Sequence, residues 1–456
     1  MNSRSSVLVL GTALFSCFVI ALCAALGIGG YIFFTRGNSV TNFFMPAPAN
    51  QIVLVGNDKN IHVIHPHNGD LTALTRDGGD TRRYNYPTWS PDNQRIAFVG
   101  YSLQDSTPTE GALYTISPRG ENLTPVFKTQ ENFPFYLYWS PDSKYVGFLS
   151  NSDSNNFALS IAQTDRPDST QVLDKGTPFY WAWSPDSAQV FTHVGGTRAE
   201  NESARLAFLN LQNNASPQPL TDLPGAFQAP QWTPDGKILF STRENNTQNI
   251  ALADAQTKST TKLAEYRGRA SFALAPDGTR IAYLVTAGNL RVPNFGPVRV
   301  MNADGTNARL VSDENALAFE WSPDSKKIAF LTIEVNDNEQ NRNAAPLLVM
   351  NASGARAFAP QYAQSARIQF AWKIWDSATD KIQIAASFVP TASFLNVLPY
   401  FDQYANSSTF WSPDSQALVY TTREQDDTGS VWIADITGKT LAQKIGDGVL
   451  AFWSWK

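Results

Sequence analysis

One short phrase recurs along the chain and limits the folds that the chain can adopt. In each copy, Trp-Ser-Pro-Asp or a close variant follows one short apolar segment and precedes another. The gaps between copies are 50, 44, 49, 42, 47 and 90 residues, measured at Trp89, Trp139, Trp183, Trp232, Leu274, Trp321 and Trp411. Spacing of this size is typical of an array in which each repeat forms one supersecondary unit.

Each repeat contains the material of four short strands. In the first full repeat, the segment ending at Trp89 is followed by a tight turn, by the apolar segments 95–99 and 112–116, and by a fourth short segment. β-branched and aromatic residues bounded by Gly, Pro, Asn and Asp are typical of antiparallel strands. No helical stretch separates them, which excludes parallel βαβ units. We therefore predict an all-β protein, a single large β-propeller of four-stranded blades.

The motif itself has a structural explanation. Proline fixes φ near −65° at the first corner of a turn, and the following Asp and Ser bond to the local backbone. The preceding Trp can bury on the order of 150–250 Å² against a neighbouring blade. We therefore interpret the Pro-Asp carboxylates as turn-forming groups and not as catalytic ones, because they recur around the whole ring.

This pattern, Trp-Ser-Pro-Asp-Gly/Ser followed by an apolar strand, resembles the WD40-like repeat of the TolB-type propellers. Related propellers occur in dipeptidyl-peptidase and acylaminoacyl-peptidase proteins. The resemblance covers about residues 50–456 and rests on seven motif copies. It implies a propeller fold and says little about function, since propellers host unrelated activities. The peptidases add a hydrolase domain with Gly-x-Ser-x-Gly, and this chain contains no such string.

The two ends of the repeat region complement each other. Segments 51–56, 60–66 and 71–75 look like the second, third and fourth strands of a blade, and 449–455 looks like an isolated first strand. Pairing them would close the ring and leave no exposed sheet edges at the junction. The gap of 90 residues also suggests a degenerate copy near Trp372. Counting Trp372 as a first strand gives nine blades, and omitting it gives eight.

A long apolar run precedes the repeats. Residues 7–34 are 28 residues without a charged side chain, which is long enough to cross a bilayer. We predict a short cytoplasmic N-terminus (1–6), a transmembrane helix (7–34), a linker (35–50) and the propeller (51–456). A cleaved signal peptide is the main alternative, and a lipoprotein signal ending at Cys17 is a second one. The prediction places a single-pass protein in the cell membrane with its propeller on the extracytoplasmic side.

Composition excludes several kinds of function. The net charge of −5 argues against nucleic acid as a partner. The two cysteines, Cys17 and Cys23, both lie in the apolar run, so residues 35–456 can form neither disulfides nor thiolate metal sites. We predict no cofactor and no metal, and a monomeric propeller. His62, His65 and His67 are close in sequence, but strand alternation does not make them converge, and the acidic stretch at Asp337 and Glu339 lacks the spacing of a calcium loop.

The connections between second and third strands are the best candidates for a binding surface. They are long and varied at 102–111, 195–204, 288–296 and 336–345, and long loops on a rigid scaffold commonly carry function. The predicted binding residues are Arg198, Arg291, Phe295 and Glu339. Near the irregular unit, Trp375, Tyr400, Phe401 and Tyr404 are either exposed aromatics or packing groups that compensate for a missing motif.

Three functions fit these features. The first is a membrane-anchored, non-enzymatic module that binds a protein, peptide or glycan at the cell envelope. The second is a glycosidase- or lyase-like enzyme, which would need paired carboxylates converging in the central funnel. The third is an envelope scaffold that holds partners together. The absence of a catalytic string favours the first.

Overall fold

The computed structural model describes residues 49–153, 156–166, 169–196, 204–211, 216–226, 228–245, 247–286, 295–335, 368–426 and 428–456. Residues 48–456 form one compact unit. The predicted segments 1–6 and 7–34, and nearly all of the linker 35–50, lie outside the described residues. No helix within the described ranges is both long enough and apolar enough to span a membrane.

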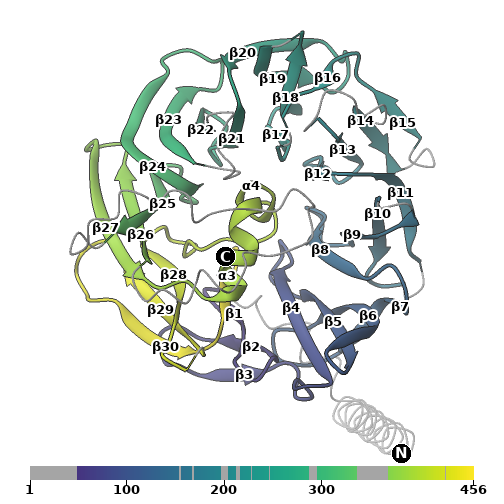
Figure 1. The fold of residues 1–456 in the computed structure, drawn as a ribbon, viewed down its shortest axis with the longest axis vertical. Coiled ribbons are helices and arrows are strands. Elements are labelled where there is room, and N and C mark those ends of the chain that lie inside the picture. The colour runs from purple at the N-terminus through teal and green to yellow at the C-terminus, as the bar shows by residue number, and fades with distance from the viewer. Residues whose placement is uncertain are drawn as a thin grey trace, which may run out of the picture. The chain divides into compact units, whose positions relative to one another are not determined.

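Three consecutive repeats form regular four-stranded antiparallel sheets around a common centre (Figure 1). The first comprises β4 (Arg82–Trp89), β5 (Ile96–Gln104), β6 (Thr107–Ile116) and β7 (Thr124–Thr129). The second comprises β8 (Pro134–Trp139), β9 (Tyr145–Asn151), β10 (Phe157–Gln163) and β11 (Gln171–Gly176). The third comprises β12 (Phe179–Trp183), β13 (Gln189–Val194), β14 (Arg205–Asn210) and β15 (Pro217–Pro219).

The next sheets are less regular. One contains β16 (Leu223–Pro224), β17 (Gln231–Trp232), β18 (Lys237–Glu244), β19 (Thr247–Asp254) and β20 (Thr260–Tyr266). A seven-stranded sheet follows, with β21 (Arg269–Leu274), β22 (Arg280–Thr286), β23 (Gly296–Asn302), β24 (Arg309–Trp321), β25 (Lys327–Val335), β26 (Ile368–Asp376) and β27 (Lys381–Phe388). The 13-residue β24 pairs with β23 through its first half and with β25 through its second half, so it serves two blades.

The last two sheets hold the ends of the unit. One contains β28 (Ala417–Arg423), β29 (Gly429–Asp435) and β30 (Gln443–Asp447). The other joins β1 (Ile52–Val55), β2 (Ile61–Ile64) and β3 (Leu71–Ala73) to the C-terminal strand β31 (Leu450–Trp453). Ile52 pairs with Trp453 and Val55 with Leu450. The predicted pairing of the two ends is therefore present.

The strand pairing corrects the count of nine blades. Trp372 lies on β26 and pairs with Leu331 of β25, so it belongs to a third strand and not to a first strand. Its blade begins with the second half of β24, which ends at Trp321. With β24 divided between two blades, the described strands form eight blades. The gap of 90 residues therefore reflects insertions within and after one blade, not a hidden copy.

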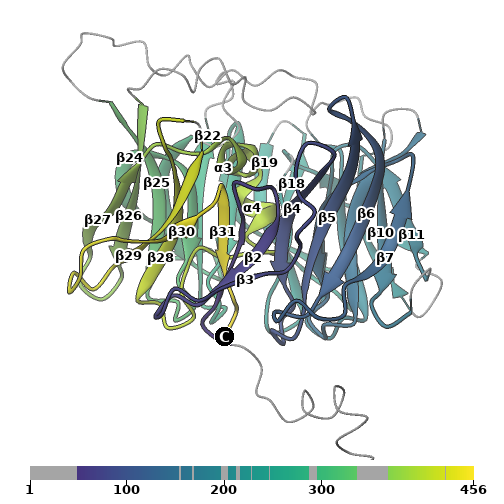
Figure 2. The same ribbon diagram turned by 90° about the horizontal axis from the view of Figure 1, so that it is seen from below.

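The two faces of the ring differ in content. The turn face carries the Pro-Asp turns, the turns between third and fourth strands, and both ends of the described unit, where the Asn50 N–H donates to the carbonyl of Lys456. Figure 2 shows the C-terminus at this face. The loop face carries the connections from second to third strands and from fourth strands to the next blade. The described strand ends that flank the predicted binding loops therefore lie opposite the point where the chain enters the ring.

The motif tryptophans bind neighbouring blades together. In four of the motif copies, the indole Nε1 donates to a backbone carbonyl one blade away, in the pairs Trp139 to Thr88 (3.2 Å), Trp232 to Ala182 (3.1 Å), Trp321 to Ala273 (3.0 Å) and Trp411 to Glu320 (3.3 Å). The Arg95 and Arg280 guanidinium groups lie 4.9 and 5.0 Å from the ring centres of Trp139 and Trp321. The predicted packing role of the motif is thus accompanied by a hydrogen bond between blades.

Candidate functional site

A helical insertion occupies the centre of the ring (Figure 1). It comprises α3 (Ala392–Val397), the short 3-10 helix η5 (Leu398–Tyr400) and α4 (Phe401–Tyr404). The Thr391 side chain caps α3 by accepting the Phe394 N–H, and its hydroxyl donates to the carbonyl of Val449. The insertion stands where a first strand would begin, so that first strand is reduced to bridges at Thr409 and Trp411.

Aromatic side chains of the insertion contact blades on several sides. The Tyr404 ring centre lies 6.0 Å from that of Tyr86 and 4.9 Å from that of Tyr136. The Phe401 ring lies 5.1 Å from Phe319. The Tyr136 hydroxyl also donates to the carbonyl of Gln403 at 2.7 Å. The ambiguity at Phe401 and Tyr404 is thereby settled, because both pack inside the ring. Trp375, one of the other two aromatics, is also fully buried.

The backbone of Tyr86, whose ring contacts Tyr404, has a strained conformation. Tyr86 has φ of +56°, which is costly for an aromatic residue, and the β4–β5 register shifts between Asn85 and Thr88. Such a bulge re-aims a side chain, and strain of this kind concentrates at functional or closely packed positions. Here it brings the Tyr86 ring against Tyr404, at the centre of the ring.

The buried carboxyl of Asp402 links the helical insertion to the segment before β17 through a hydrogen bond. Asp402 is only 4% exposed, and it accepts the N–H groups of Ala229 and Gln403, each at 3.0 Å. Burial raises the pKa of Asp402 to about 6, against the opposing effect of these hydrogen bonds. Asp402 therefore titrates close to neutrality and anchors α4 to the segment that precedes β17.

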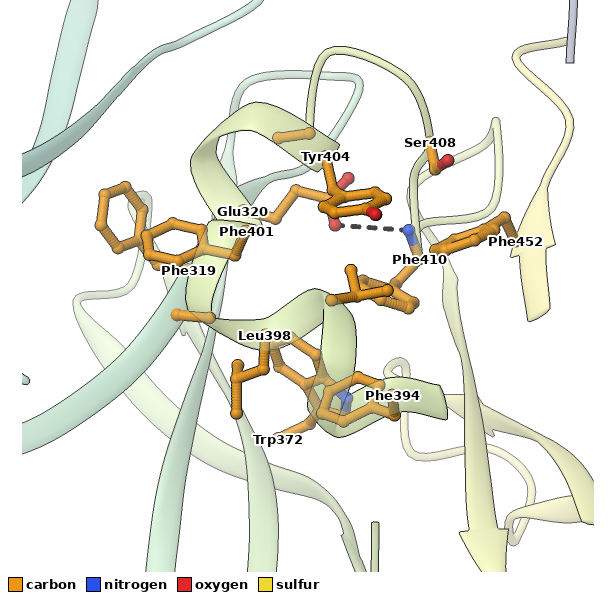
Figure 3. Close-up of a pocket in the computed structure, with 13 residues that line it drawn as sticks. Phe319, Glu320, Trp372, Phe394, Leu398, Phe401, Tyr404, Ser408, Phe410 and Phe452 are labelled. Atoms are coloured by element: carbon orange, nitrogen blue, oxygen red, sulfur yellow. Dashed lines mark hydrogen bonds between the residues drawn. The ribbon is translucent and has the colours of Figure 1, made fainter. Parts of the chain in front are cut away.

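A second carboxyl lines a small cavity beside the insertion (Figure 3). Glu320 accepts the Phe410 N–H at 3.3 Å, and the cavity walls include Trp372, Phe394 and Phe452. Glu320 is half-buried because the cavity reaches it, yet the apolar walls remove it from bulk water and raise its pKa to about 7. The cavity holds about 30 Å³, which is room for water but not for a sugar ring.

Sequence reasoning missed both carboxyls, although one signal was present. The residue before the motif position is Thr, Tyr, Ala, Gln, Ala or Phe in six copies, and it is Glu320 in the seventh. A lone acidic residue on an otherwise uncharged strand position is a sign of a buried carboxyl. Asp402 carries no such signal, because the insertion has no counterpart in the other repeats.

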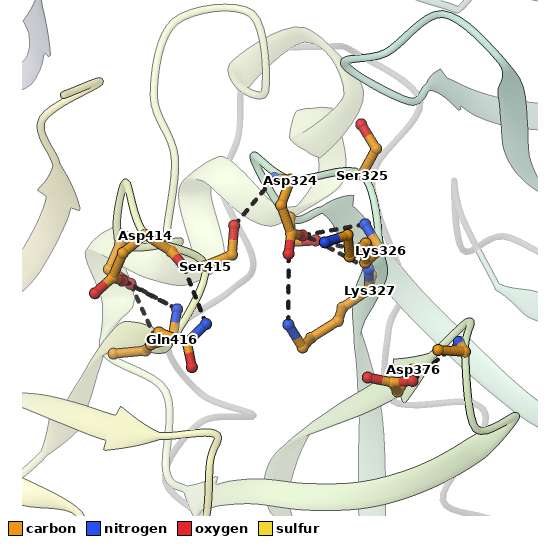
Figure 4. A network of polar contacts seen from close by, with 12 residues as sticks. Asp324, Ser325, Lys326, Lys327, Asp376, Asp414, Ser415 and Gln416 are labelled. Carbon is orange, nitrogen blue, oxygen red and sulfur yellow. Dashed lines mark hydrogen bonds and ion pairs between the residues drawn. The ribbon is translucent and has the colours of Figure 1, made fainter.

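The Pro-Asp turns use their carboxylates internally (Figure 4). In the turn at Asp324, the carboxylate accepts the Ser322 hydroxyl at 2.6 Å and the Lys326 N–H at 3.1 Å, and its backbone N–H donates to the Ser415 hydroxyl of the next blade. Burial acts to raise the pKa of Asp324, but these bonds and the nearby lysines outweigh it and lower the pKa. The geometry fits the predicted turn-forming role.

The predicted binding residues are mostly beyond what the structure describes. Arg198, Arg291 and Glu339 lie outside the described residues. Phe295 is half-buried, its N–H donates to the Thr286 hydroxyl at 2.8 Å, and its side chain packs against a hydrophobic cluster. Phe295 therefore supports the base of the loop face as well as being a candidate contact.

The prediction of a long loop at 102–111 is wrong, because this segment is a β-hairpin. Strands β5 and β6 continue through it as a hairpin and pair to Gln104 and Thr107. Asp105 and Ser106 form its two-residue turn with φ of +48° and +65°, as in the turns that favour hairpins. The turn residues are Asp-Ser and not the usual Asn-Gly or Asp-Gly, so the sequence carries no hairpin signal at this position.

The histidine cluster does not converge. The His62 ring lies 3.0 Å from a carboxylate oxygen of Asp58, His67 contacts Asn50, and the His65 and His67 rings are 5.7 Å apart. No group of three potential metal ligands occurs among the described residues. The remaining histidine, His193, lies in β13, where burial lowers its pKa to about 4 and keeps it neutral.

Comparisons with known proteins support the fold and not a function. No protein-family profile matches the sequence. No curated protein matches it either. A solved dihydro-heme d1 dehydrogenase in complex with DHE is 12% identical over 90% of this chain and 75% of that chain, with a TM-score of 0.52. A eukaryotic initiation factor is 13% identical over 89% of this chain and 98% of that chain, with a TM-score of 0.50.

Solved structures of TolB proteins match this chain less closely than the two structures above. TolB from Acinetobacter baumannii is 18% identical over 59% of this chain, and the match spans 66% of the TolB chain. The TM-score of this match is 0.36, so the two structures do not superpose in detail. At these identities the likeness shows the fold alone, and the fold that this chain shares with its structural neighbours is a β-propeller.

Proposed function

We propose that this chain is a membrane-anchored, extracytoplasmic binding module, which captures an envelope protein, a peptide or a glycan at the loop face of its propeller. The observation that carries the proposal is the helical insertion. The centre of the ring, where a propeller enzyme would hold its substrate, is filled by the chain's own Phe401 and Tyr404 against Phe319, Tyr86 and Tyr136.

The arrangement of the faces supports the same function. The described unit begins on the turn face, where Asn50 contacts Lys456. An anchor formed by residues 7–34 would therefore be joined to that face, and the loop face would be the face opposite the junction. The Pro-Asp turns are chemically uniform, whereas the connections of the loop face vary in length and sequence. Variable connections on a rigid scaffold suit the recognition of a specific partner.

A propeller enzyme is the alternative, and Glu320 is the observation in its favour. A carboxyl whose pKa is raised to about 7 is suited to general acid–base chemistry at neutral pH. Its cavity of about 30 Å³ would have to enlarge by movement of α3 and α4 before a substrate could enter. An enzyme of this kind would lose turnover in the Glu320→Gln variant, whereas a binding module would keep its partner.

Site-specific photo-crosslinking in native membranes tests the proposal. A photoreactive residue is placed at Asp105, the exposed tip of the β5–β6 hairpin on the loop face, and at Lys144, an exposed position on the turn face. We expect a specific crosslinked product from Asp105 and none from Lys144. A product from Lys144 alone would place the working surface on the turn face and contradict the proposal.

A further inference from the structure

Exposed aliphatic side chains recur around the turn-face rim of the ring. Of the large hydrophobic side chains that are exposed within the described ranges, all but Leu223 lie where an outermost strand begins, at its turn-face end. They are Leu71, Leu123, Val172, Leu310, Ile382 with its neighbour Ile384, and Leu441. Leu223 lies at the opposite end, because it pairs with Arg243 near the loop-face end of β18.

This placement follows from strand direction. Leu71 pairs with Ile64, whose strand partner Ile52 lies beside the motif position Trp453. Leu441 follows Asp435, which pairs with Ala417 directly after a Pro-Asp turn. Single exposed leucines need no explanation, but seven of the eight large exposed aliphatic side chains among the described residues lie at the turn-face rim, which makes this rim a candidate contact surface.

Leu441 is the most exposed member and is held in place. It is 92% exposed. The turn that presents it is fixed by Asp435, whose carboxylate accepts the N–H and hydroxyl of Thr437 and of Thr440 at 2.6–3.0 Å. Burial acts to raise the pKa of Asp435, but these bonds outweigh it and lower the pKa to about 2. Leu441 thus projects from a rigid turn.

Three rim leucines flank the point where the chain enters the ring. Asn50 bonds to His67 at 3.1 Å, in the turn that leads to Leu71, which is 56% exposed. The blades on either side carry Leu441 and Leu123, and Leu123 is 46% exposed. Backbone hydrogen bonds join both of these blades to the blade formed by β31, β1, β2 and β3. The Trp453 N–H donates to the carbonyl of Thr409 on one side, and the Tyr84 N–H donates to the carbonyl of Lys59 on the other.

The residues that precede this junction indicate what the rim contacts. Residues 35–49 are only a short linker after the uncharged run 7–34. A flexible linker of this length has a mean span of roughly 20 Å, so an anchor would hold the turn face close to the bilayer surface. Exposed aliphatic side chains next to a bilayer insert at the boundary between headgroups and acyl chains.

We infer that the turn-face rim formed by Leu441, Leu71 and Leu123 rests on the lipid headgroup region of the membrane that holds the N-terminal anchor. This inference rests on the proposed anchor and adds an orientation to it: the turn face lies against lipid and the loop face is presented to partners. The turns of this rim carry exposed Lys439 and Arg119 and equally exposed Asp70 and Glu121, so charges of both signs balance there. We therefore expect an apolar contact that needs no excess of anionic lipid.

The full chain in lipid nanodiscs provides the test. In a background with Cys17→Ser and Cys23→Ser, an environment-sensitive fluorophore is attached to Leu441→Cys, to Leu71→Cys, or to the control Leu223→Cys, which replaces a leucine of 53% exposure on the loop face. The lipids carry a nitroxide quencher at the top of the acyl chain. We expect several-fold stronger quenching at positions 441 and 71 than at 223.

Each outcome has a distinct meaning. Equal quenching at 441 and 223 would overturn the lipid contact while leaving the anchor intact. A chain that does not co-purify with nanodiscs would show that the anchor itself is wrong, and the inference would fall with it. A label at 441 that lipid does not quench, but that native membranes shield from a water-soluble quencher, would assign the rim to a protein partner and contradict the inference. Unchanged melting temperatures confirm that all variants are folded.

Discussion

The indole Nε1 of Trp321 donates a hydrogen bond of 3.0 Å to the backbone carbonyl of Ala273 in the preceding blade. Trp139 makes the equivalent bond to Thr88, and both rings lie beneath an arginine. The motif tryptophans are thus packing groups, and four of them, Trp139, Trp232, Trp321 and Trp411, are also hydrogen-bond donors between blades. The repeated motif is explained by these contacts without any role in chemistry.

The first prediction concerns this contact. Trp321→Ala should lower the free energy of unfolding by about 3–5 kcal/mol, because it leaves a cavity between blades and an unpaired carbonyl. Trp321→Phe should cost less, since most of the apolar contact remains. Leu441→Ala, at an exposed position, is the control and should change stability by less than about 0.5 kcal/mol. Denaturant unfolding measures all three, and equal costs for Trp321→Ala and Leu441→Ala would contradict this account.

The second prediction concerns the joined ends. Deletion of residues 449–456 removes β31 and exposes the unpaired edge of β1. It also removes the Trp455 indole bond to the carbonyl of Trp89 in the next blade. We expect loss of cooperative thermal unfolding, or aggregation, measured by calorimetry and light scattering. A truncated chain with an unchanged melting temperature would show that β31 does not hold the ring together.

The repeats made most of the fold predictable. Motif spacing gave the blades, and the unmatched segments at 51–75 and 449–455 gave the pairing of β1 with β31. The error at Trp372 has a local cause. A strand of apolar and aromatic residues looks the same whether it stands first or third in a blade, and only pairing with Leu331 distinguishes the two.

The centre of the ring could not be predicted in the same way. The insertion from Ala392 to Tyr404 occurs once, so no repeat indicates its position, and its aromatic residues are compatible with exposure or with packing. Asp402 becomes significant only because Ala229, from a distant part of the sequence, supplies an N–H to it. Contacts between segments that are far apart in a chain are not encoded in local patterns.

The third prediction concerns pH. The folded-state pKa of Glu320, about 7, is raised above the ordinary value of 4.5, so its protonated form stabilises the folded chain. This contribution is fully present below about pH 4.5 and is lost as pH rises towards 7. Glu320→Gln, which mimics the protonated form, should therefore become more stable than the unmodified protein between pH 4.5 and 8. Asp402→Asn should also gain stability relative to the unmodified protein as pH rises, but over a lower pH range, from pH 3.8 to about pH 6.

Thermal unfolding of each pair across this range measures the effect. The difference between variant and unmodified protein is the quantity to compare, because the lowered pKa values of Asp142 and Asp324 make the whole protein respond in the opposite direction. A difference that stays constant from pH 4.5 to 8 would show that Glu320 ionises normally in the folded chain.

The most direct test of the account compares its two faces in one capture experiment. Loop-face variants Arg198→Ala and Arg291→Ala, and a turn-face triple variant in which Asp142, Asp186 and Asp324 become alanine, are used to capture partners from detergent-solubilised membranes. Captured partner is normalised to folded protein, and melting temperatures are recorded in parallel. The account predicts weaker capture with unchanged melting temperature for the loop-face variants, and a lower melting temperature with retained capture for the triple variant. Loss of capture in the triple variant at an unchanged melting temperature, with normal capture by both loop-face variants, would contradict it.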